Sequence, residues 1–250
     1  LEWINRHVLK PYHKHTFILT NQLDIDETVI DWDIYGPPRR LPNIFWDRRN
    51  KIGRIEYFKF INQPGTNKEI ASDSAKIVRL VRQNLKKWKL LGMRGLIIDL
   101  RKHQGGNFLP LVKSLRRDVI GDASLFSWTN VKVSKTMKKW VNSSMKFTKF
   151  KGNLKMKLPI AILIGRDTTS SGELCAAIFK GRSNTRSFGQ KTYGHFSSNE
   201  DFELSKKYTL VLTVNLTQTA DMEFGDEFLR PDKRTRKPVS EAKKWIISHT

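Results

Sequence analysis

The serine pair Ser170-Ser171 is the place in this chain where residue type and spacing best fit chemistry. It lies in residues 168–174, TTSSGEL, between a short apolar run and a second apolar segment. A serine at a strand-to-helix junction has its hydroxyl close to unpaired backbone N–H groups and to the positive end of the helix dipole, which together stabilise an oxyanion. The position therefore suits acyl transfer with Ser170 as the attacking residue.

The same serine also fits a purely structural role. Ser170 followed by Glu173 matches the capping box, in which serine and glutamate satisfy the first N–H groups of a helix. A serine that starts a helix can still attack a substrate, so the two roles are compatible. Residues elsewhere in the chain have to decide between them.

Two neighbouring segments would hold this serine in place. Residues 158–164, LPIAILI, are rich in β-branched side chains and predict a strand covered on both faces. Residues 174–179 are apolar and predict a helix, which Gly181 is placed to end. The single cysteine, Cys175, falls in this helix, where a free thiol is expected to pack as a small hydrophobe.

The rest of the chain alternates strand and helix signals and then turns to strands. The expected elements are a strand at 52–60, a helix at 70–90, a buried strand at 95–100, a helix starting near Phe108, a strand at 209–214 and a short closing helix at 242–247. Residues 105–107, GGN, are expected to bend the chain into the second helix. Residues 1–50 predict irregular chain with short strands. This order is typical of a mixed α/β core.

The net charge of +22 is concentrated in the middle of the chain. Residues 51–200 hold 30 of the 46 Lys and Arg but only 9 of the 24 acids, a local charge of +21. Residues 132–157 alone carry nine lysines and no acid, interleaved with aromatic side chains. Such a stretch fits an anionic surface, polymer or acidic peptide, whereas a solvated lysine-rich flap is the plainer interpretation.

We predict one domain, because no Gly, Ser or Pro-rich linker divides the chain. Its expected parts are an N-terminal segment 1–50 carrying the catalytic base, a core made of 51–117 and 158–250, and a basic cap insertion 118–157. No apolar run is long enough to span a bilayer, and the start does not resemble a signal peptide. The chain does not begin with methionine, and any membrane anchor is expected to lie outside it.

Several blocks taken in order resemble the C-terminal-processing, or tail-specific, serine peptidase family. They are 52–60, GLIIDLR at 95–101 with GGN at 105–107, TTSSGEL at 168–174, and the later blocks 181–186, 189–194, 199–205 and 231–232. The resemblance implies a ClpP/crotonase-like peptidase core. No PDZ-like insertion is apparent, so the fold class expected is α/β with a basic cap and without a PDZ domain.

Within that family, the serine motif and KHTF at 14–17 look most like the nisin-resistance-protein branch. The resemblance implies Ser170 as nucleophile and His15 as general base. By the same analogy, the backbone N–H of Ser171 and one from Gly105 or Gly106 would form the oxyanion hole. Imidazole titrates near neutral pH and can carry the serine proton to the leaving amine.

Three departures from the family pattern bear on these roles. His195 stands where tail-specific peptidases place a lysine, which makes it the alternative base. His103 stands where the signature has asparagine, beside the expected oxyanion loop, and the glycines that usually precede the histidine motif are absent. The late acids Asp221, Glu223 and Glu227 are candidates for orienting the base, although a surface position is the simpler expectation.

Asn107 and Glu200 are candidate substrate contacts. Glu200 suits a basic substrate group, although a plain charge at the end of a strand is the simpler expectation. No metal site is expected, because His13 and His15 have no further ligand nearby and HExxH is absent. No cofactor is expected either, since P-loop and dinucleotide fingerprints are missing.

The sequence thus predicts a serine endopeptidase that cleaves extended peptides or protein C-terminal segments through an acyl-enzyme on Ser170. The alternative is a catalytically impaired, peptidase-like module that binds an anionic polymer, membrane surface or peptide. Peptide or protein substrates are the expected partners, and nucleic acid is not favoured. The resemblance implies the extracytoplasmic face of a bacterial membrane as the location.

Overall fold

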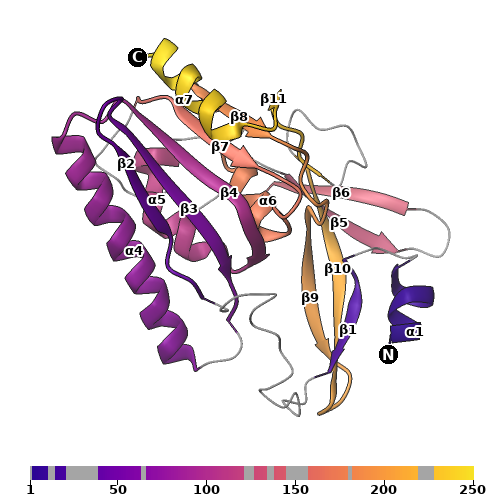
Figure 1. Ribbon diagram of the computed structural model, residues 1–250. Helices are drawn as coiled ribbons and strands as arrows, with labels where there is room; N and C mark the ends of the chain where they lie inside the picture. Colours follow the sequence, from indigo (N-terminus) through magenta and orange to yellow (C-terminus); the bar gives the residue numbers. More distant parts are fainter. Residues whose placement is uncertain are drawn as a thin grey trace.

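The computed structural model of this chain describes residues 2–10, 15–20, 39–62, 66–120, 127–133, 138–144, 157–179, 182–218 and 228–250. They form two β-sheets with helices packed on the larger one (Figure 1). The mixed α/β architecture predicted from the sequence is confirmed.

The larger sheet has six strands in the order β11-β8-β7-β4-β3-β2. Their bounds are β2 (Asn43–Asp47), β3 (Ile52–Phe60), β4 (Gly95–Gly106), β7 (Ile160–Ile164), β8 (Thr185–Gly189) and β11 (Lys233–Arg234). β3, β4, β7 and β8 are parallel neighbours, so their carboxyl ends meet at one edge of the sheet. Every residue of β7 is buried, as its continuous apolar sequence predicts.

Helices cover both faces of this sheet. α4 (Asn67–Leu90), α5 (Leu109–Ile120) and α6 (Ser171–Ala177) enclose the main core, and α7 (Pro238–Ser248) covers the other face. α4 begins at the capping residue Thr66, whose hydroxyl accepts a hydrogen bond from the Glu69 N–H. On the far face, Ala242 and Ile246 of α7 pack against the sheet.

The second sheet lies beside the first (Figure 1). It contains β1 (Phe17–Thr20), β5 (Ser127–Val133), β6 (Lys138–Ser144), β9 (Ser197–Glu203) and β10 (Tyr208–Gln218), and a short helical segment, α1 (Glu2–Ile4) with η1 (Asn5–Leu9), precedes it. β10 is the long central strand, with β1 and β5 on one side and β9 on the other. This pairing brings the residues before β1 next to the start of β9.

Most predicted elements are confirmed, with shifted ends. β4 continues through Gly105 and Gly106, where a bend was expected, and its register with β3 shifts twice near that end. The helical segment at Glu2–Leu9 was not predicted. The described part of the predicted insertion 118–157 contains the end of α5 and the hairpin β5–β6, which extends the second sheet. Among the described residues, no helix has the length and apolar character needed to cross a membrane.

Candidate active site

Ser170 sits on a sharp turn between β7 and α6 with an unusual backbone conformation. Its φ is 50° and its ψ is −119°, a region that residues with a side chain seldom adopt. Such a conformation costs on the order of 1–3 kcal/mol and persists only where surrounding contacts fix it. Strained strand-to-helix turns of this kind expose a nucleophilic serine in several hydrolases.

Hydrogen bonds on both sides of Ser170 fix this turn. The Thr168 hydroxyl donates to the Leu100 carbonyl of β4 at 2.9 Å. The Thr169 N–H donates to the His103 carbonyl at 3.2 Å, so the turn is attached to β4 at two points. On the helix side, the N–H of Leu174 donates to the Ser170 carbonyl at 3.1 Å.

Gly105 at the end of β4 lies directly against Ser170. A Cβ atom placed on Gly105 would lie 3.2 Å from the Ser170 Cβ, and the Gly105 φ of 99° itself disfavours a side chain. The next residue, Gly106, lies so close to the Phe60 carbonyl that a Cβ atom placed on it would be 2.2 Å from the carbonyl oxygen. Of the two glycines of the GGN block, Gly105 is thus in contact with the serine, and Gly106 follows it against the end of β3.

His103 is buried beneath the Gly105-Gly106 end of β4. Its Nδ1 accepts a hydrogen bond from the Gly105 N–H at 3.3 Å. Burial lowers the His103 pKa to about 4, so the imidazole is neutral at physiological pH. The Gly105 N–H thus already has an acceptor, which leaves Gly106 as the better of the two glycine candidates for an oxyanion donor.

A buried carboxylate, Glu173, joins the serine turn to the loop that follows β8. One of its oxygens, Oε2, accepts the N–H of Ser170 at 2.9 Å and the N–H of His195 at 2.8 Å. The other, Oε1, accepts the Gly194 N–H at 3.0 Å and the Thr192 hydroxyl. The bond to Ser170 is the glutamate half of the predicted capping box, and the other three bonds hold a distant loop.

The Glu173 carboxyl is completely buried, and desolvation raises its pKa to about 7. The four hydrogen bonds oppose this rise because they stabilise the ionised form. Ionised Glu173 offers acceptor positions to all four donors, which explains how a charge is tolerated in this interior.

The two candidate bases, His15 and His195, lie face to face. Their rings stack with centroids 4.4 Å apart and an angle of 10° between planes. Tyr193 contacts the His195 ring edge-on at a centroid distance of 4.6 Å. Two segments separated by most of the chain therefore supply one imidazole pair, and the Glu173 bonds connect it to the turn that carries Ser170.

His15 is fixed from the second sheet. Its Nδ1 forms a hydrogen bond of 2.8 Å with the Ser197 hydroxyl, and its carbonyl accepts from the Asn199 amide at 2.8 Å. The adjacent Thr16 is buried, and its hydroxyl accepts the Thr213 N–H at 3.1 Å. With Nδ1 engaged by Ser197, Nε2 is the ring nitrogen suited to serve a nucleophile.

The remaining sequence candidates lie in less direct positions. The Asn107 side chain accepts from the Leu109 N–H at 2.9 Å and donates to Asn62 at 3.2 Å, so it helps to start α5. Glu200 is exposed on β9. Cys175 is fully buried and burial raises its thiol pKa, in line with the predicted packing role.

Some candidates fall outside the part of the chain that the structure describes: His13, Gly181, Asp221, Glu223 and Glu227. Among the described residues, no group of three or more His, Cys, Asp or Glu side chains is arranged to hold a metal ion.

The family model of the S41 peptidases matches residues 51–233, which take in the serine turn, the Gly105-Gly106 strand end and Glu173. The chain belongs to peptidase family S41. The prediction of a serine-peptidase chain of the tail-specific kind is confirmed at the level of the family.

Individual relatives agree with this assignment. The nisin-resistance protein of Lactococcus lactis subsp. lactis is 33% identical over 160 residues, covering 62% of this chain and 50% of that protein. The chain thus spans about half the length of this curated relative. The predicted similarity to the nisin-resistance branch of the S41 peptidases is confirmed.

Solved structures share the S41 fold. A lipoprotein from Streptococcus agalactiae superposes with a TM-score of 0.69 at 23% identity, covering 94% of this chain and 77% of that one. A structure from Bacteroides fragilis NCTC 9343 assigned to the S41 proteases has a TM-score of 0.52 at 15% identity, covering 83% of this chain and 53% of that one. At these identities the comparison establishes the fold alone.

Sequence reasoning missed two residues of this S41 site. Glu173 was given only a capping role, although a lone acid in the buried stretch of α6 signals a need for several donors. Ser197 was not singled out, because its contact with His15 joins residues 182 positions apart. Only the pairing of β1 and β9 with β10 brings them together.

Proposed function

We propose that this chain is a serine endopeptidase that cleaves extended peptides or protein C-terminal segments through an acyl-enzyme on Ser170. A histidine acts as the general base, and we assign this role to His15. The proposal is supported chiefly by Glu173, whose carboxylate binds both the Ser170 N–H and the His195 N–H. This one side chain couples the position of the serine to the position of the histidine pair.

In the first half of the reaction, the Ser170 oxygen attacks the substrate carbonyl carbon and its proton passes to His15 Nε2. The negative charge on the carbonyl oxygen is stabilised by the N–H groups of Ser171 and Gly106. The tetrahedral species then collapses, the C–N bond breaks, and the imidazolium returns the proton to the departing amine. The products are a free amine and an ester on Ser170.

In the second half, a water molecule attacks the ester and gives its proton to His15. Collapse of the second tetrahedral species breaks the C–O bond to Ser170, and the serine oxygen recovers a proton from the imidazolium. The bond between His15 Nδ1 and Ser197 keeps the ring oriented through both steps. Ser197 thus takes the orienting place that an acid takes in many serine peptidases.

His195 supports this chemistry as the stacking partner of His15. Two charged imidazoles at a centroid distance of 4.4 Å would repel each other, so the pair carries one positive charge when His15 holds the serine proton. The neutral ring of His195 then presents its face to the imidazolium.

An extended substrate fits the free edge of β9. Among the described strands, β9 pairs with β10 alone, and it begins at Ser197 beside His15. A peptide that adds to this edge gains main-chain hydrogen bonds and is led toward the candidate site. Glu200, Asp201 and Glu203 are exposed on the strand and favour basic side chains in the substrate despite the positive charge of the chain.

The proposed activity is tested with an internally quenched peptide that carries lysine residues on both sides of its cleavable region. Hydrolysis by the wild-type chain that disappears in Ser170→Ala, but persists in Ser171→Ala, supports the proposal. Ser171→Ala is a matched control because the Ser171 hydroxyl is buried without a hydrogen-bond partner among the described residues. Binding of the peptide without any hydrolysis would instead favour the impaired, peptide-binding module.

A further inference from the structure

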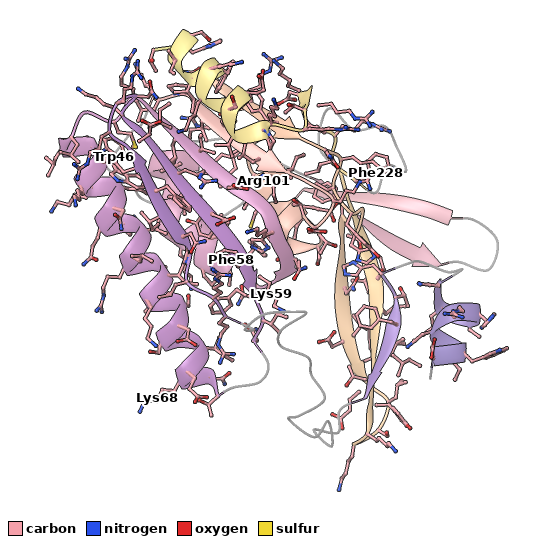
Figure 2. All side chains as sticks on the ribbon, viewed as in Figure 1. Trp46, Phe58, Lys59, Lys68, Arg101 and Phe228 are labelled. Carbon is pink, nitrogen blue, oxygen red and sulfur yellow. The ribbon has the colours of Figure 1, made fainter. Side chains whose placement is uncertain are left out.

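One end of the molecule, at the amino ends of the parallel strands, carries a cluster of exposed cations. Trp46 of β2 stacks on Trp88 of α4 with ring centroids 5.7 Å apart, and Figure 2 shows Trp46 at this end. The Arg94 N–H donates to the Lys51 carbonyl at 2.9 Å. We name this surface the cationic end and define it by seven exposed residues: Arg48, Arg49, Lys51, Lys86, Lys87, Lys89 and Arg94.

These charges are not neutralised within the described part of the chain, where none of the seven forms an ion pair. The acid beside them, Asp47, is bound to Lys243 at 2.7 Å, and Glu241 is bound to Lys233 and Lys244. The last two turns of α4 contribute three of the lysines, and the turn between β2 and β3 contributes three more of the cations. The cationic end therefore presents an uncompensated positive field to solvent.

Two exposed leucines directly follow the lysines at the end of α4. Leu90 is 82% exposed and Leu91 is 47% exposed, whereas α4 turns Leu85 and Trp88 into the core. The preceding lysines lie on the same turn, and Lys51 Nζ lies close to Gly92, the residue that follows Leu91. Adjacent exposed apolar side chains surrounded by cations are a feature of surfaces that rest on lipid headgroups.

The geometry points to the surface of an anionic lipid bilayer as the partner of the cationic end. The seven cations would contact anionic headgroups, while Leu90 and Leu91 would enter the boundary between headgroups and acyl chains. A soluble polyanion would use the cations but would leave the leucines in water. The bilayer accounts for both kinds of side chain, and we therefore favour it.

This surface lies far from the candidate active site. β4 begins at Gly95, next to Arg94, and reaches the site at Gly106, and twelve residues of strand span roughly 35 Å. A chain resting on a bilayer through the cationic end would present Ser170 away from the lipid. The inference stands apart from the proposed catalysis, so Ser170→Ala should bind vesicles as the wild type does.

Sedimentation with vesicles tests the charge contribution. The wild-type chain is expected to bind vesicles of phosphatidylcholine and phosphatidylglycerol at roughly two to one, and not phosphatidylcholine alone. Each cation near the surface is worth about a fivefold change in affinity, so Lys86→Gln/Lys87→Gln/Lys89→Gln should weaken binding on the order of a hundredfold. The matched control is Lys68→Gln/Lys76→Gln/Arg79→Gln, which removes three exposed cations from the part of α4 that precedes Leu80, and Figure 2 shows Lys68 near the start of this helix.

A polarity-sensitive fluorophore tests the contribution of the leucines. Leu90→Cys supplies an exposed thiol for labelling, because the natural Cys175 is buried and burial raises its pKa. The label should shift to shorter wavelength with the anionic vesicles, whereas a label at Ser72→Cys, exposed on the same helix, should not. Unfolding midpoints equal to that of the wild type verify that the variants are folded.

Three outcomes would overturn the inference. One is the absence of binding to the anionic vesicles, and another is an equal loss of binding in the two triple variants. The third is binding without a spectral shift at Leu90→Cys together with full competition by soluble polyphosphate, which would identify a polyanion site without lipid insertion.

Discussion

The Glu173 carboxylate accepts the backbone N–H of His195 at 2.8 Å, across 22 positions of the sequence. The same oxygen accepts the Ser170 N–H, so a single buried atom fixes the strained serine and the loop of the histidine pair. In the proposed mechanism, Glu173 therefore links the turn that carries Ser170 to the loop whose His195 stacks on His15, without taking part in bond making. We propose that Glu173 is a positioning residue.

Replacing Glu173 should lower activity strongly, although its carboxylate does not touch the reacting atoms. In Glu173→Gln, either orientation of the amide turns its NH2 group toward at least one backbone N–H donor, and each unsatisfied buried group costs about 1–3 kcal/mol. We expect the free energy of unfolding to fall by about 2–4 kcal/mol and kcat/KM to fall on the order of a hundredfold, since small misplacements of catalytic groups have effects of that size.

The matched comparison for this variant is Glu69→Gln, which alters the exposed capping glutamate of α4. It should reduce stability only slightly and leave kcat/KM unchanged. Equal losses of kcat/KM in the two variants would contradict the positioning role of Glu173.

The two stacked histidines should differ in their contribution to turnover. His15→Ala removes the proposed base and should lower kcat by about four orders of magnitude. His195→Ala removes only the stacking partner and should lower kcat by a factor of about ten to a hundred. Single-turnover hydrolysis measured in both variants checks the assignment, and the reverse order of effects would transfer the base to His195.

Gly105→Ala should reduce activity through a direct clash at the nucleophile. The new methyl group would lie 3.2 Å from the Ser170 Cβ, at a backbone φ of 99°. We expect a loss of about 1–3 kcal/mol in stability and a larger proportional loss in kcat than in substrate binding. A comparison is Gly165→Ala, whose added Cβ would lie 3.6 Å from its nearest side-chain atom, an ordinary contact, and which should behave like the wild type. Full activity of Gly105→Ala would argue against the tight site described above.

Glu173 and His103 should impose opposite pH dependences on stability. Folding raises the Glu173 pKa from 4.5 to about 7, so the folded chain holds a proton that the unfolded chain has lost, and stability falls as pH rises between these values. Folding lowers the His103 pKa from 6.5 to about 4, so the unfolded chain binds the extra proton, and stability rises with pH over that range. Between about pH 5 and 6.5 the two effects nearly cancel, each amounting to about 2 kcal/mol.

Each single variant should show the pH dependence of stability that is cancelled in the wild type. As pH rises from about 5 to 6.5, the free energy of unfolding of Glu173→Gln should rise from its lowered value, while that of His103→Asn should fall by a similar amount and that of the wild type should stay nearly constant. Urea unfolding at the two pH values measures this directly. Parallel pH profiles for the wild type and both variants would show that neither group titrates as described.

The sequence was sufficient for the central layer of the fold. The continuous apolar run before Ser170 became β7, and the helical spacing of Ile77, Val81, Leu85 and Trp88 became the buried face of α4. These signals are local, because burial on a strand or helix face leaves a regular period in the sequence. A local sequence pattern likewise placed Ser170 at the start of α6.

Contacts between distant segments could not be read in this way. The stacking of His15 on His195 depends on strands that pair across the second sheet, and no local period reports such pairing. The strained φ of Ser170 and the bond from Gly105 to His103 are likewise set by tertiary contacts. The sequence thus supplied both candidate bases, but their arrangement as one stacked pair required the structure.

Labelling with an active-site fluorophosphonate tests the central claim most directly. Intact-protein and peptide mass spectrometry should show one adduct, on Ser170, that is absent in Ser170→Ala and retained in Ser171→Ala. Labelling that is unchanged in Ser170→Ala, or no labelling of a folded wild-type chain that hydrolyses peptide, would contradict an acyl-enzyme on this serine.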